Sequence, residues 1–380
     1  MKLAAYYFPN WHVDPRNEQW HGTGWTEWQV VKYATPRFPG HKQPKVPLWG
    51  YDDEADPRMM EKKITTAVSY GIESFIFDWY WMDDGLYRER CLEEGFLKAA
   101  NTNDMEFGIM WANHNAILAH PATRMCNSAV LARCCTTPEI FKQATDYCIK
   151  NYFGRRNYMR IGGKVFFSVF SVDKFIKELG GIERARELML DFRKRVRDAG
   201  LGELYFNAID ASAGLLGNAN GNEDDFEEIN RIAKLLTLDS WGTHMYGISG
   251  HFPDVDYSEW VKDLPEIYRK RSQGYDIAYN PCISVGWDTS PRTVQSEVYE
   301  LGPYPYTQIV HDNTPQKFKK ALQNLKKFAH SADMTGDLVT INSWNEWTEG
   351  AYLEPDQDYG FGYLEAVRDV FKKSAAKIYP

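Results

Sequence analysis

Apolar runs recur along the chain and are separated by polar or amphipathic stretches. Eight of these runs have the length and composition of buried strands. They are Leu3–Pro9, Ser74–Trp81, Glu106–Asn113, Lys164–Val172, Leu204–Asp210, Leu236–Gly247, Ile277–Asp288 and Leu338–Trp344. The clearest helical periodicity between them lies in Pro57–Tyr70, Ile182–Ala199, Ser258–Arg271 and Pro315–Ala329. Eight strands alternating with helices predict an α/β fold, a (β/α)8 TIM barrel forming a single catalytic domain over residues 1–380.

One connection in this pattern is much longer than the others. The segment Asn10–Asp56, between the first strand and the first clear helix, is rich in Pro, Gly, Trp and His. Ordinary connections in such folds are a few residues long. We therefore expect this long loop to fold over the end of the barrel at which the strands finish.

Composition narrows the class of function. Hydrophobic residues make up 43% of the chain and aromatic residues 15%, with 13 Trp, 23 Tyr and 20 Phe. This content supports a large core and a ligand cleft that uses aromatic surfaces. The net charge is −8 and basic residues form no long run, so we expect no nucleic-acid partner. No apolar stretch is long enough for a membrane span.

The compartment follows only weakly from the sequence. The first residues, Met1–Pro9, are too short and too aromatic for a secretory signal. The six cysteines have neither metal-site spacing nor the density of a disulfide scaffold, so we expect free thiols. We expect a cytoplasmic protein, or a periplasmic or secreted one from which a signal has been removed.

Polar and aromatic residues gather where the predicted strands end. Parallel strands of a barrel present such residues at one rim, where ligands of this fold bind. The substrate-binding candidates are Tyr6, Trp25, Glu27, Trp28, Asp78, Trp79, Trp81, Trp111, Asn113, Asp210, His244, Tyr246, Trp344 and Asn345. Taken singly, a residue such as Tyr246 fits core packing equally well, and Asp210 fits a helix cap. As a group they predict a site, with tryptophans as stacking platforms for sugar rings.

The stretch Trp344–Gly350 carries the strongest chemical signal. It follows the strand Leu338–Ile341 and places Glu346 and Glu349 between tryptophans. Two carboxyl groups can divide acid and base roles at a glycosidic bond, so both are catalytic candidates. The competing interpretation is an ordinary acidic surface loop. The first and last strands of a barrel are neighbours, so Glu27 should lie close to this pair.

Other chemistries lack their usual signatures. No His pair has metal-site spacing on a helix, no glycine-rich phosphate loop follows the first strand, and no serine-hydrolase elbow occurs. Histidines such as His12, His21, His41, His114 and His244 are better read as partners of sugar hydroxyls. We therefore expect no metal and no cofactor, and an oligosaccharide or polysaccharide as the substrate.

Several motifs resemble one known family. They are Tyr6-Tyr7-Phe8-Pro9, G-x-G-W-T-E-W at Gly22–Trp28, P-R-F-P-G-H-x-Q-P at Pro36–Pro44, Trp111-Ala112-Asn113, and N-x-W-N-E-W-x-E-G-x-x-L-E-P at Asn342–Pro355. Together they resemble the glycoside hydrolase family 99-like, or WbsX-type, proteins over nearly the whole chain. The resemblance implies a (β/α)8 barrel. Some members of that family are described as glycosyltransferases of polysaccharide biosynthesis and others as hydrolases.

The more distant family 99 enzymes are retaining endo-α-mannosidases with a similar N-E-W-x-E-G signature. By this resemblance, Glu349 would be the general acid/base. Glu346 would be the base that helps the substrate's own 2-hydroxyl attack the anomeric carbon, giving a 1,2-anhydro sugar. The loops of this chain differ from theirs, so mannose and the endo mode carry over less firmly than the glutamates. Spacing in the sequence does not decide between retention and inversion.

Three functions remain open at this point. The first is a glycoside hydrolase that cleaves an α-linked glycan, with mannose-containing glycans among the candidates. The second is a glycosyltransferase of surface polysaccharide biosynthesis, which would need basic residues or a metal for a diphosphate. The third is a non-catalytic glycan-binding protein. The predicted rim is acidic and aromatic with little Lys or Arg, which favours the hydrolase.

Overall fold

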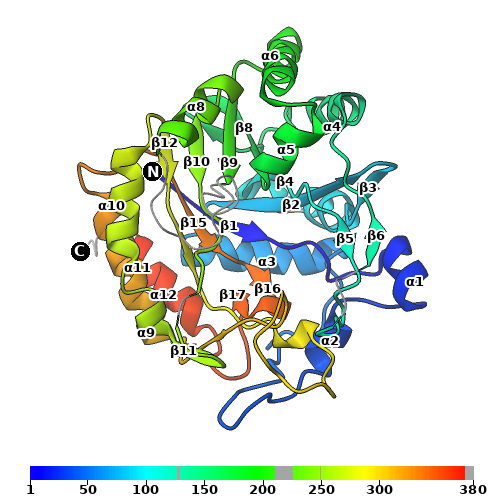
Figure 1. Ribbon diagram of the computed structural model, residues 1–380, viewed down its shortest axis with the longest axis vertical. Helices are drawn as coiled ribbons and strands as arrows, with labels where there is room; N and C mark the ends of the chain where they lie inside the picture. Colours follow the sequence, from blue (N-terminus) through cyan, green and yellow to red (C-terminus); the bar gives the residue numbers. More distant parts are fainter. Residues whose placement is uncertain (126–128, 210–225, 249, 373–380) are drawn as a thin grey trace, which may run out of the picture.

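The computed structural model describes residues 1–125, 129–209, 226–248 and 250–372 (Figure 1). Nine parallel strands form a nearly closed barrel with helices around it, which confirms the predicted fold class. In spatial order these strands are β12 (Ala278–Asn280), β10 (Ser240–Gly242), β9 (Leu204–Ile209), β8 (Lys164–Val169), β4 (Glu106–Trp111), β2 (Ser74–Met82), β1 (Lys2–Tyr7), β15 (Leu338–Asn342) and β13 (Cys282–Ser284).

Nine strands occupy eight positions because the seventh is interrupted. β12 pairs with β10, and β13 pairs with β15, while Pro281 separates the two halves. Proline has no backbone N–H to donate to a neighbouring strand, which explains the interruption. The first and last strands, β1 and β15, pair in parallel with Leu3 opposite Val339. The Trp25–Trp28 loop and the Trp344–Gly350 loop therefore start from adjacent strands.

The helices cover the outside of the barrel (Figure 1). They are α3 (Pro57–Tyr70), α4 (Pro138–Asn151), α5 (Val172–Glu178), α6 (Ile182–Asp198), α8 (Phe226–Leu236), α9 (Tyr257–Trp260), α10 (Leu264–Gly274), α11 (Pro315–Ala329) and α12 (Gly362–Phe371). Two further helices, α1 (Pro15–His21) and α2 (Trp28–Lys32), lie in the long first loop. Among the described residues, no helix combines the length and the hydropathy needed to cross a bilayer.

Short elements complete the chain. The strands among them are β3 (Gly85–Tyr87), β5 (Ala116–Ile117), β6 (Val130–Ala132), β7 (Arg160–Ile161), β11 (Asp254–Asp256), β14 (Ile309–His311), β16 (Asn345–Glu346) and β17 (Ala351–Tyr352). Single turns of 3₁₀ or π helix occur at Cys91–Gly95, Phe96–Lys98, Thr102–Asp104, Ser290–Arg292 and Trp347–Glu349. The predicted helix Ser258–Arg271 is two helices, α9 and α10, separated by residues 261–263.

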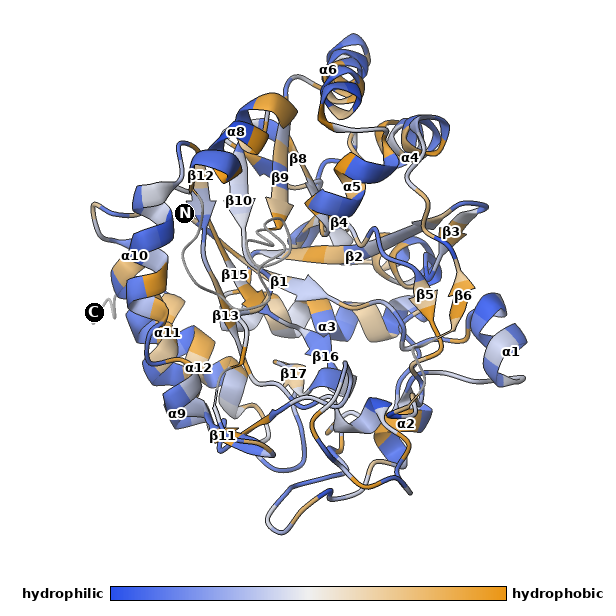
Figure 2. Cartoon of the chain, viewed as in Figure 1, coloured by the Kyte–Doolittle hydropathy of each residue, from blue (hydrophilic) through white to orange (hydrophobic). Residues whose placement is uncertain are grey.

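Two hydrophobic layers result from the alternation of side chains along the strands. One layer packs between strands and helices, and its members include Tyr7, Phe77, Trp79 and Trp111. The other faces the barrel interior and includes Tyr6, Ile76 and Met110. Figure 2 shows apolar colour along the strands and on helix faces turned toward them, with polar colour on outer helix faces. The five cysteines in the described part of the chain are free thiols, as expected.

Candidate active site

A cavity of about 490 Å³ opens where the barrel strands end. Phe8 reaches it after β1, Asp78 and Tyr80 from β2, Met110 from β4 and Ile209 from β9. The long first loop contributes Asn17, Trp20 and His21 to the wall. The cavity thus occupies the position that the sequence predicts, and the long loop folds across the rim.

Both glutamates of the Trp344–Gly350 motif line this cavity. Glu346 lies on β16, which forms a tight antiparallel pair with β17, and Glu349 lies on the single helical turn between these two strands. Gly350 closes the turn with φ of 64°, and a Cβ there would lie 2.8 Å from Cβ of Asp288. Only glycine fits at this position. The backbone N–H of Asp288 donates to the Glu349 carbonyl at 2.5 Å and ties the turn to the seventh-strand loop.

One buried guanidinium joins three carboxylates. Arg292 Nη2 lies 2.7 Å from Glu346 Oε1 and 3.0 Å from Glu27 Oε1, and Nη1 lies 2.5 Å from Glu349 Oε1. The Thr348 hydroxyl donates to Glu27 Oε1 at 2.6 Å. Glu27 therefore joins the predicted pair, as the neighbouring first and last strands require. Arg292 was not predicted, because an isolated Arg in a loop gives no signal in the sequence.

The pKa values of Glu346 and Glu27 are shifted in opposite directions by their surroundings. Burial raises the pKa of Glu346, and the negative charges of Glu349, Glu27 and Asp78 raise it further. The positive charge of Arg292 lowers it, but the net result is a pKa well above the usual value. Burial also acts to raise the pKa of Glu27, but His120 and Arg292 outweigh it and hold that pKa well below the usual value. Nε2 of His120 lies 3.2 Å from Glu27 Oε1. Glu27 is thus a permanent anion beside a carboxyl that retains its proton more readily.

Asp78 is a buried carboxyl that faces the cavity. Burial raises its pKa well above the usual value, and the charge of Glu349 adds to this effect. Its Oδ1 has no hydrogen-bond partner among the described residues. Buried polar atoms are normally paired, so this oxygen is available to a ligand hydroxyl. His244, another predicted residue, also lines the cavity and packs against the Tyr6 ring at 4.7 Å between centroids.

Several predicted residues bond to the backbone of residues in or near the cavity wall and so fix its shape. Asn113 bonds to the backbone N–H and carbonyl of Ser171, at 2.7 and 2.8 Å. Asn345 holds the backbone of Phe8 in the same way, at 2.8 and 2.9 Å. Tyr6 donates to the Thr243 carbonyl at 3.2 Å. The amides fix the backbone beside Ser171 and Phe8, which themselves line the cavity.

The predicted tryptophans lie elsewhere than expected. Four are buried in the core and do not line the cavity: Trp28, Trp79, Trp111 and Trp344. The half-buried Trp25 and Trp81 are not part of its wall either, although Trp25 stacks on His21 at 4.2 Å between ring centroids. Trp20 and Trp287 line the cavity instead. Alternation explains two cases, because Asp78 and Tyr80 face inward and so turn Trp79 outward, while Met110 and Ala112 do the same to Trp111.

Two further predictions have different outcomes. The Tyr246 hydroxyl lies 2.7 Å from that of Tyr279, and Tyr246 does not belong to the cavity wall. Asp210 lies outside the described residues. The cavity residues that the sequence did not single out include Trp20, Tyr87, Arg88, His120, Arg292 and Tyr304. Two arginines, Arg88 and Arg292, are the strongly basic residues among the described residues of the wall.

A second polar cluster supports the loop from the side away from the cavity. The buried Lys63 of α3 lies 2.7 Å from Oε1 of both Glu54 and Glu354, and 3.4 Å from Asp52. Glu354 also accepts from Trp347 Nε1 at 2.7 Å. This cluster fixes Trp347, the residue that follows Glu346.

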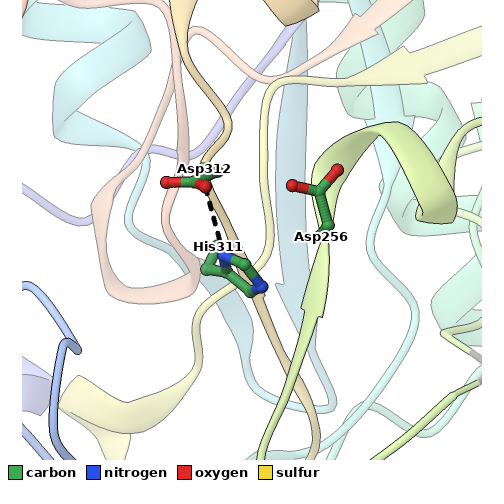
Figure 3. A group of neighbouring side chains, drawn as sticks. All are labelled: Asp256, His311 and Asp312. Atoms are coloured by element: carbon green, nitrogen blue, oxygen red, sulfur yellow. Dashed lines mark ion pairs between the residues drawn. The ribbon is translucent and has the colours of Figure 1, made fainter.

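One group in the described part of the chain has the donor atoms of a metal site. Asp256, His311 and Asp312 each offer a ligand-type atom, and these atoms lie within 4.8 Å of one another (Figure 3). However, Lys317 contacts Asp256 and its Nζ lies 3.9 Å from Asp312. The ammonium already supplies the positive charge beside these carboxylates. The group is also separate from the cavity, so it has no part in the chemistry considered below.

Comparison with known proteins places these features in context. The sequence model of the family described as Glycosyltransferase WbsX matches residues 3–367. Two curated proteins named WxcX, from two strains of Xanthomonas campestris pv. campestris and described as uncharacterized, are each 24% identical over 389 residues. The match covers 98% of this chain and 50% of each relative, so the chain spans about half the length of these proteins.

Solved structures share the fold at low sequence identity. The GH99 endo-alpha-mannosidase from Bacteroides thetaiotaomicron superposes with a TM-score of 0.57 at 14% identity, covering 97% of this chain and 95% of the other. A structure described as a glycoside hydrolase-like protein gives a TM-score of 0.59 at 14% identity, covering 98% and 94%.

Proposed function

Because this chain belongs to the WbsX family, we propose that it is a carbohydrate-active enzyme, and more narrowly a glycoside hydrolase that cleaves an α-linked glycan. One observation carries the narrower proposal. Glu346 and Glu349 line the same cavity and bind the same guanidinium, that of Arg292. The mannosidase that shares the fold makes mannose-containing glycans the first substrates to test.

Glu349 is proposed as the general acid. Its Oε1 accepts from the Tyr304 hydroxyl at 2.8 Å and from Arg292 Nη1 at 2.5 Å, and both donors belong to the cavity wall. These donors fix the orientation of the carboxyl group toward a bound sugar. In the first step Glu349 gives its proton to the glycosidic oxygen as the bond from that oxygen to the anomeric carbon breaks.

Glu346 is proposed as the base on the opposite side of the reaction. Its ionised carboxylate takes the proton of the sugar's 2-hydroxyl, and that oxygen attacks the anomeric carbon to give a 1,2-anhydro sugar. Water then opens this ring, with Glu349 accepting a proton from the water and Glu346 returning one to the 2-oxygen. Two inversions at the anomeric carbon give net retention.

The surroundings of Glu346 support the base role. A base is most effective when its pKa lies near the working pH, because it is then both ionised and strongly basic. Burial and three neighbouring carboxyl groups raise the pKa of Glu346, whereas Arg292 limits the rise.

Glycosyl transfer is the second candidate, favoured by the description of the family. Two arginines, Arg88 and Arg292, lie at the cavity, and basic residues are needed to bind a nucleotide diphosphate. Arg292 is already engaged by three carboxylates, which leaves Arg88 alone for this purpose. We therefore prefer hydrolysis.

Digestion of a glycan library, read by mass spectrometry, tests this proposal. We expect an α-linked glycan to be converted into shorter glycans whose masses sum to that of the substrate plus one water. Glu349→Gln should abolish this conversion. A parallel thermal-shift screen with nucleoside diphosphates tests transfer. Clear stabilisation by a diphosphate, together with no cleavage of any glycan, would replace hydrolysis with transfer. Binding without turnover in both assays would identify a glycan-binding protein.

A further inference from the structure

Arg88 differs from Arg292 in making no ion pair within 4.0 Å with the described residues, although the charge of Glu27 acts on it from farther away. Its side chain lines the cavity and is 7% exposed. Its Nε has no hydrogen-bond partner, and no carboxylate of the described residues lies within 4.0 Å of its guanidinium. Burying a cation without a paired anion is unfavourable, so such groups usually belong to ion pairs or to ligand sites.

Aromatic rings surround the guanidinium where an acid would be expected. Its Cζ lies 5.0 Å from the ring centre of Phe8 and 4.6 Å from those of Tyr80 and Tyr87. Cation–π contacts of this kind stabilise a buried arginine partly, and they leave its N–H groups in the ring plane free to donate. The site therefore keeps a positive charge, and the Nε–H of Arg88 has no hydrogen-bond partner among the described residues.

The polar neighbours on this wall are neutral at physiological pH. Burial, with contributions from nearby cations, lowers the pKa of His114 and of His21 to about 4. Burial raises the pKa of Tyr87 to about 12, although Arg88 opposes the rise. Arg88 is thus the charged group of a wall otherwise formed by uncharged rings. Three carboxyl groups pair with Arg292, and a fourth at the cavity, Asp78, makes no ion pair with either arginine, although the charge of Arg88 opposes the rise in its pKa.

The backbone presents Arg88 in a fixed position. Arg88 follows β3, whose Tyr87 pairs with Tyr80 of β2, and it has a φ of 61°. Its N–H donates to Asp14 Oδ2 at 3.2 Å, and Asp14 also caps α1. The Tyr87 hydroxyl donates to Asn17 Oδ1 at 2.7 Å. A charged side chain held in this way needs little reorganisation to bind an anion, which favours affinity.

From these contacts we infer that Arg88 forms a subsite for an anionic group on the glycan: a carboxylate, a sulfate ester or a phosphate monoester. The guanidinium donates paired N–H groups, whose geometry suits the oxygens of all three groups. The preferred substrate is then an acidic glycan whose charged group lies beside Arg88 while the scissile bond lies beside Glu346 and Glu349. This inference rests on the proposed action on glycans.

Binding measurements with matched ligands test the subsite. The probes are α-linked oligosaccharides in neutral form and in forms that carry a uronic acid, a sulfate or a phosphate, titrated by calorimetry. We expect at least one acidic form to bind about 10- to 100-fold more tightly than its neutral match, as charge-assisted hydrogen bonds typically provide. The three anionic arms show which group the site takes.

Variants assign the preference to Arg88. Arg88→Met removes the charge and keeps a long apolar side chain, and it should abolish the preference. Arg88→Lys should keep part of it. Arg184→Met is the control, because Arg184 is exposed on α6 and pairs with Glu187 at 2.6 Å. If Arg88→Met does not fold, the Arg88→Lys protein and the salt dependence of wild-type binding provide the test. A preference for acidic forms that increasing salt does not weaken would contradict the inference.

Other outcomes would overturn the subsite. Equal binding of neutral and acidic forms would do so, as would an acidic preference that survives in Arg88→Met. Tight binding of a nucleoside diphosphate that Arg88→Met abolishes would assign Arg88 to a nucleotide. These results are separate from the test of hydrolysis. If the protein prefers acidic glycans but cleaves none, the subsite is supported and the hydrolase proposal is contradicted. If it cleaves glycans without any preference for acidic forms, the hydrolase proposal is supported and the subsite is contradicted.

Discussion

Nη2 of Arg292 lies 2.7 Å from Oε1 of Glu346 in a buried ion pair at the floor of the cavity. The same guanidinium binds Glu349 and Glu27. Groups this close titrate together, so the raised pKa of Glu346 depends on the charges of the whole cluster. The ion pair with Arg292 both positions Glu346 and influences its pKa. The pH dependence of activity therefore reports on the protonation of Glu346.

The first prediction concerns the acidic limb of the pH profile. Only ionised Glu346 can accept a proton, so kcat/KM should rise with pH through its raised pKa. Asp78 contributes a negative charge that raises this pKa. Asp78→Asn should therefore move the limb to lower pH, by about one unit on the usual scale of such shifts. The measurement is the pH profile of kcat/KM on one glycan, with the exposed Asp191→Asn as control. A shift to higher pH would contradict the assignment.

A second prediction separates cavity tryptophans from core tryptophans. Trp20 and Trp287 line the cavity, whereas Trp111 is fully buried beside Phe141. Trp20→Ala or Trp287→Ala should weaken glycan binding by about 1–3 kcal/mol through loss of apolar contact and stacking. Trp111→Ala should instead lower the free energy of unfolding by about 3–5 kcal/mol. Calorimetric titration and urea denaturation measure the two effects. Loss of stability without selective loss of binding in all three variants would show that none of these rings contacts a sugar.

Local signals in the sequence predicted much of the fold. The bounds of α3 and α11 agree with prediction because each begins with Pro after a capping residue, Asp56 or Thr314, and Gly71 ends α3 with a φ of 95°. Each predicted run contains a barrel strand because each is apolar, but the sixth run holds only β10 and the seventh is divided into β12 and β13. The break between α9 and α10 was missed, since the periodicity continues across it and tertiary packing alone decides it.

The site was predictable to a smaller extent. Glu346, Glu349 and Glu27 were found because a distinctive motif and the adjacency of β1 and β15 bring them together. Arg88 and Arg292 were missed because loop arginines are usually solvated, and only the folded chain shows that these two are buried. The direction of Trp79 could have been deduced, because a strand that turns Asp78 toward the ligand must turn its neighbour away.

A third prediction concerns the buried Lys63 cluster. Lys63 is fully buried among Glu54, Glu354 and Asp52, so its removal leaves buried carboxylates without a cation. Lys63→Met should lower the free energy of unfolding by about 3–5 kcal/mol. The matched control is Lys142→Met, because Lys142 pairs with Asp146 at 2.6 Å on the exposed face of α4. That variant should lose about 1 kcal/mol or less. Equal losses in denaturant titrations would contradict the structural role of the cluster.

A fourth prediction uses Glu354 as an internal control for Glu349. Glu354 is 2% exposed and bonds to Trp347 and Lys63, away from the cavity wall. Gln at this position loses the ion pair with Lys63, so Glu354→Gln should lower the stability of the protein. Gln can still accept from Trp347 Nε1, so the variant should keep far more activity than Glu349→Gln. Turnover of both variants is compared at a temperature where both are folded. Equal loss of activity would mean that the acid has been misassigned.

The most direct test of the two-glutamate mechanism varies the leaving group. A sugar alkoxide needs protonation to depart, whereas fluoride or an acidic phenol does not. Glu349→Gln should lose roughly 10²–10⁴-fold in rate on a natural glycan, the usual size of general acid–base catalysis, and recover much of that loss on an activated glycoside. Glu346→Gln should show no recovery, because its carboxylate acts on the attacking hydroxyl whatever departs. Recovery in Glu346→Gln alone would exchange the two roles. Recovery in neither folded variant would contradict acid-assisted cleavage of a glycoside by this site.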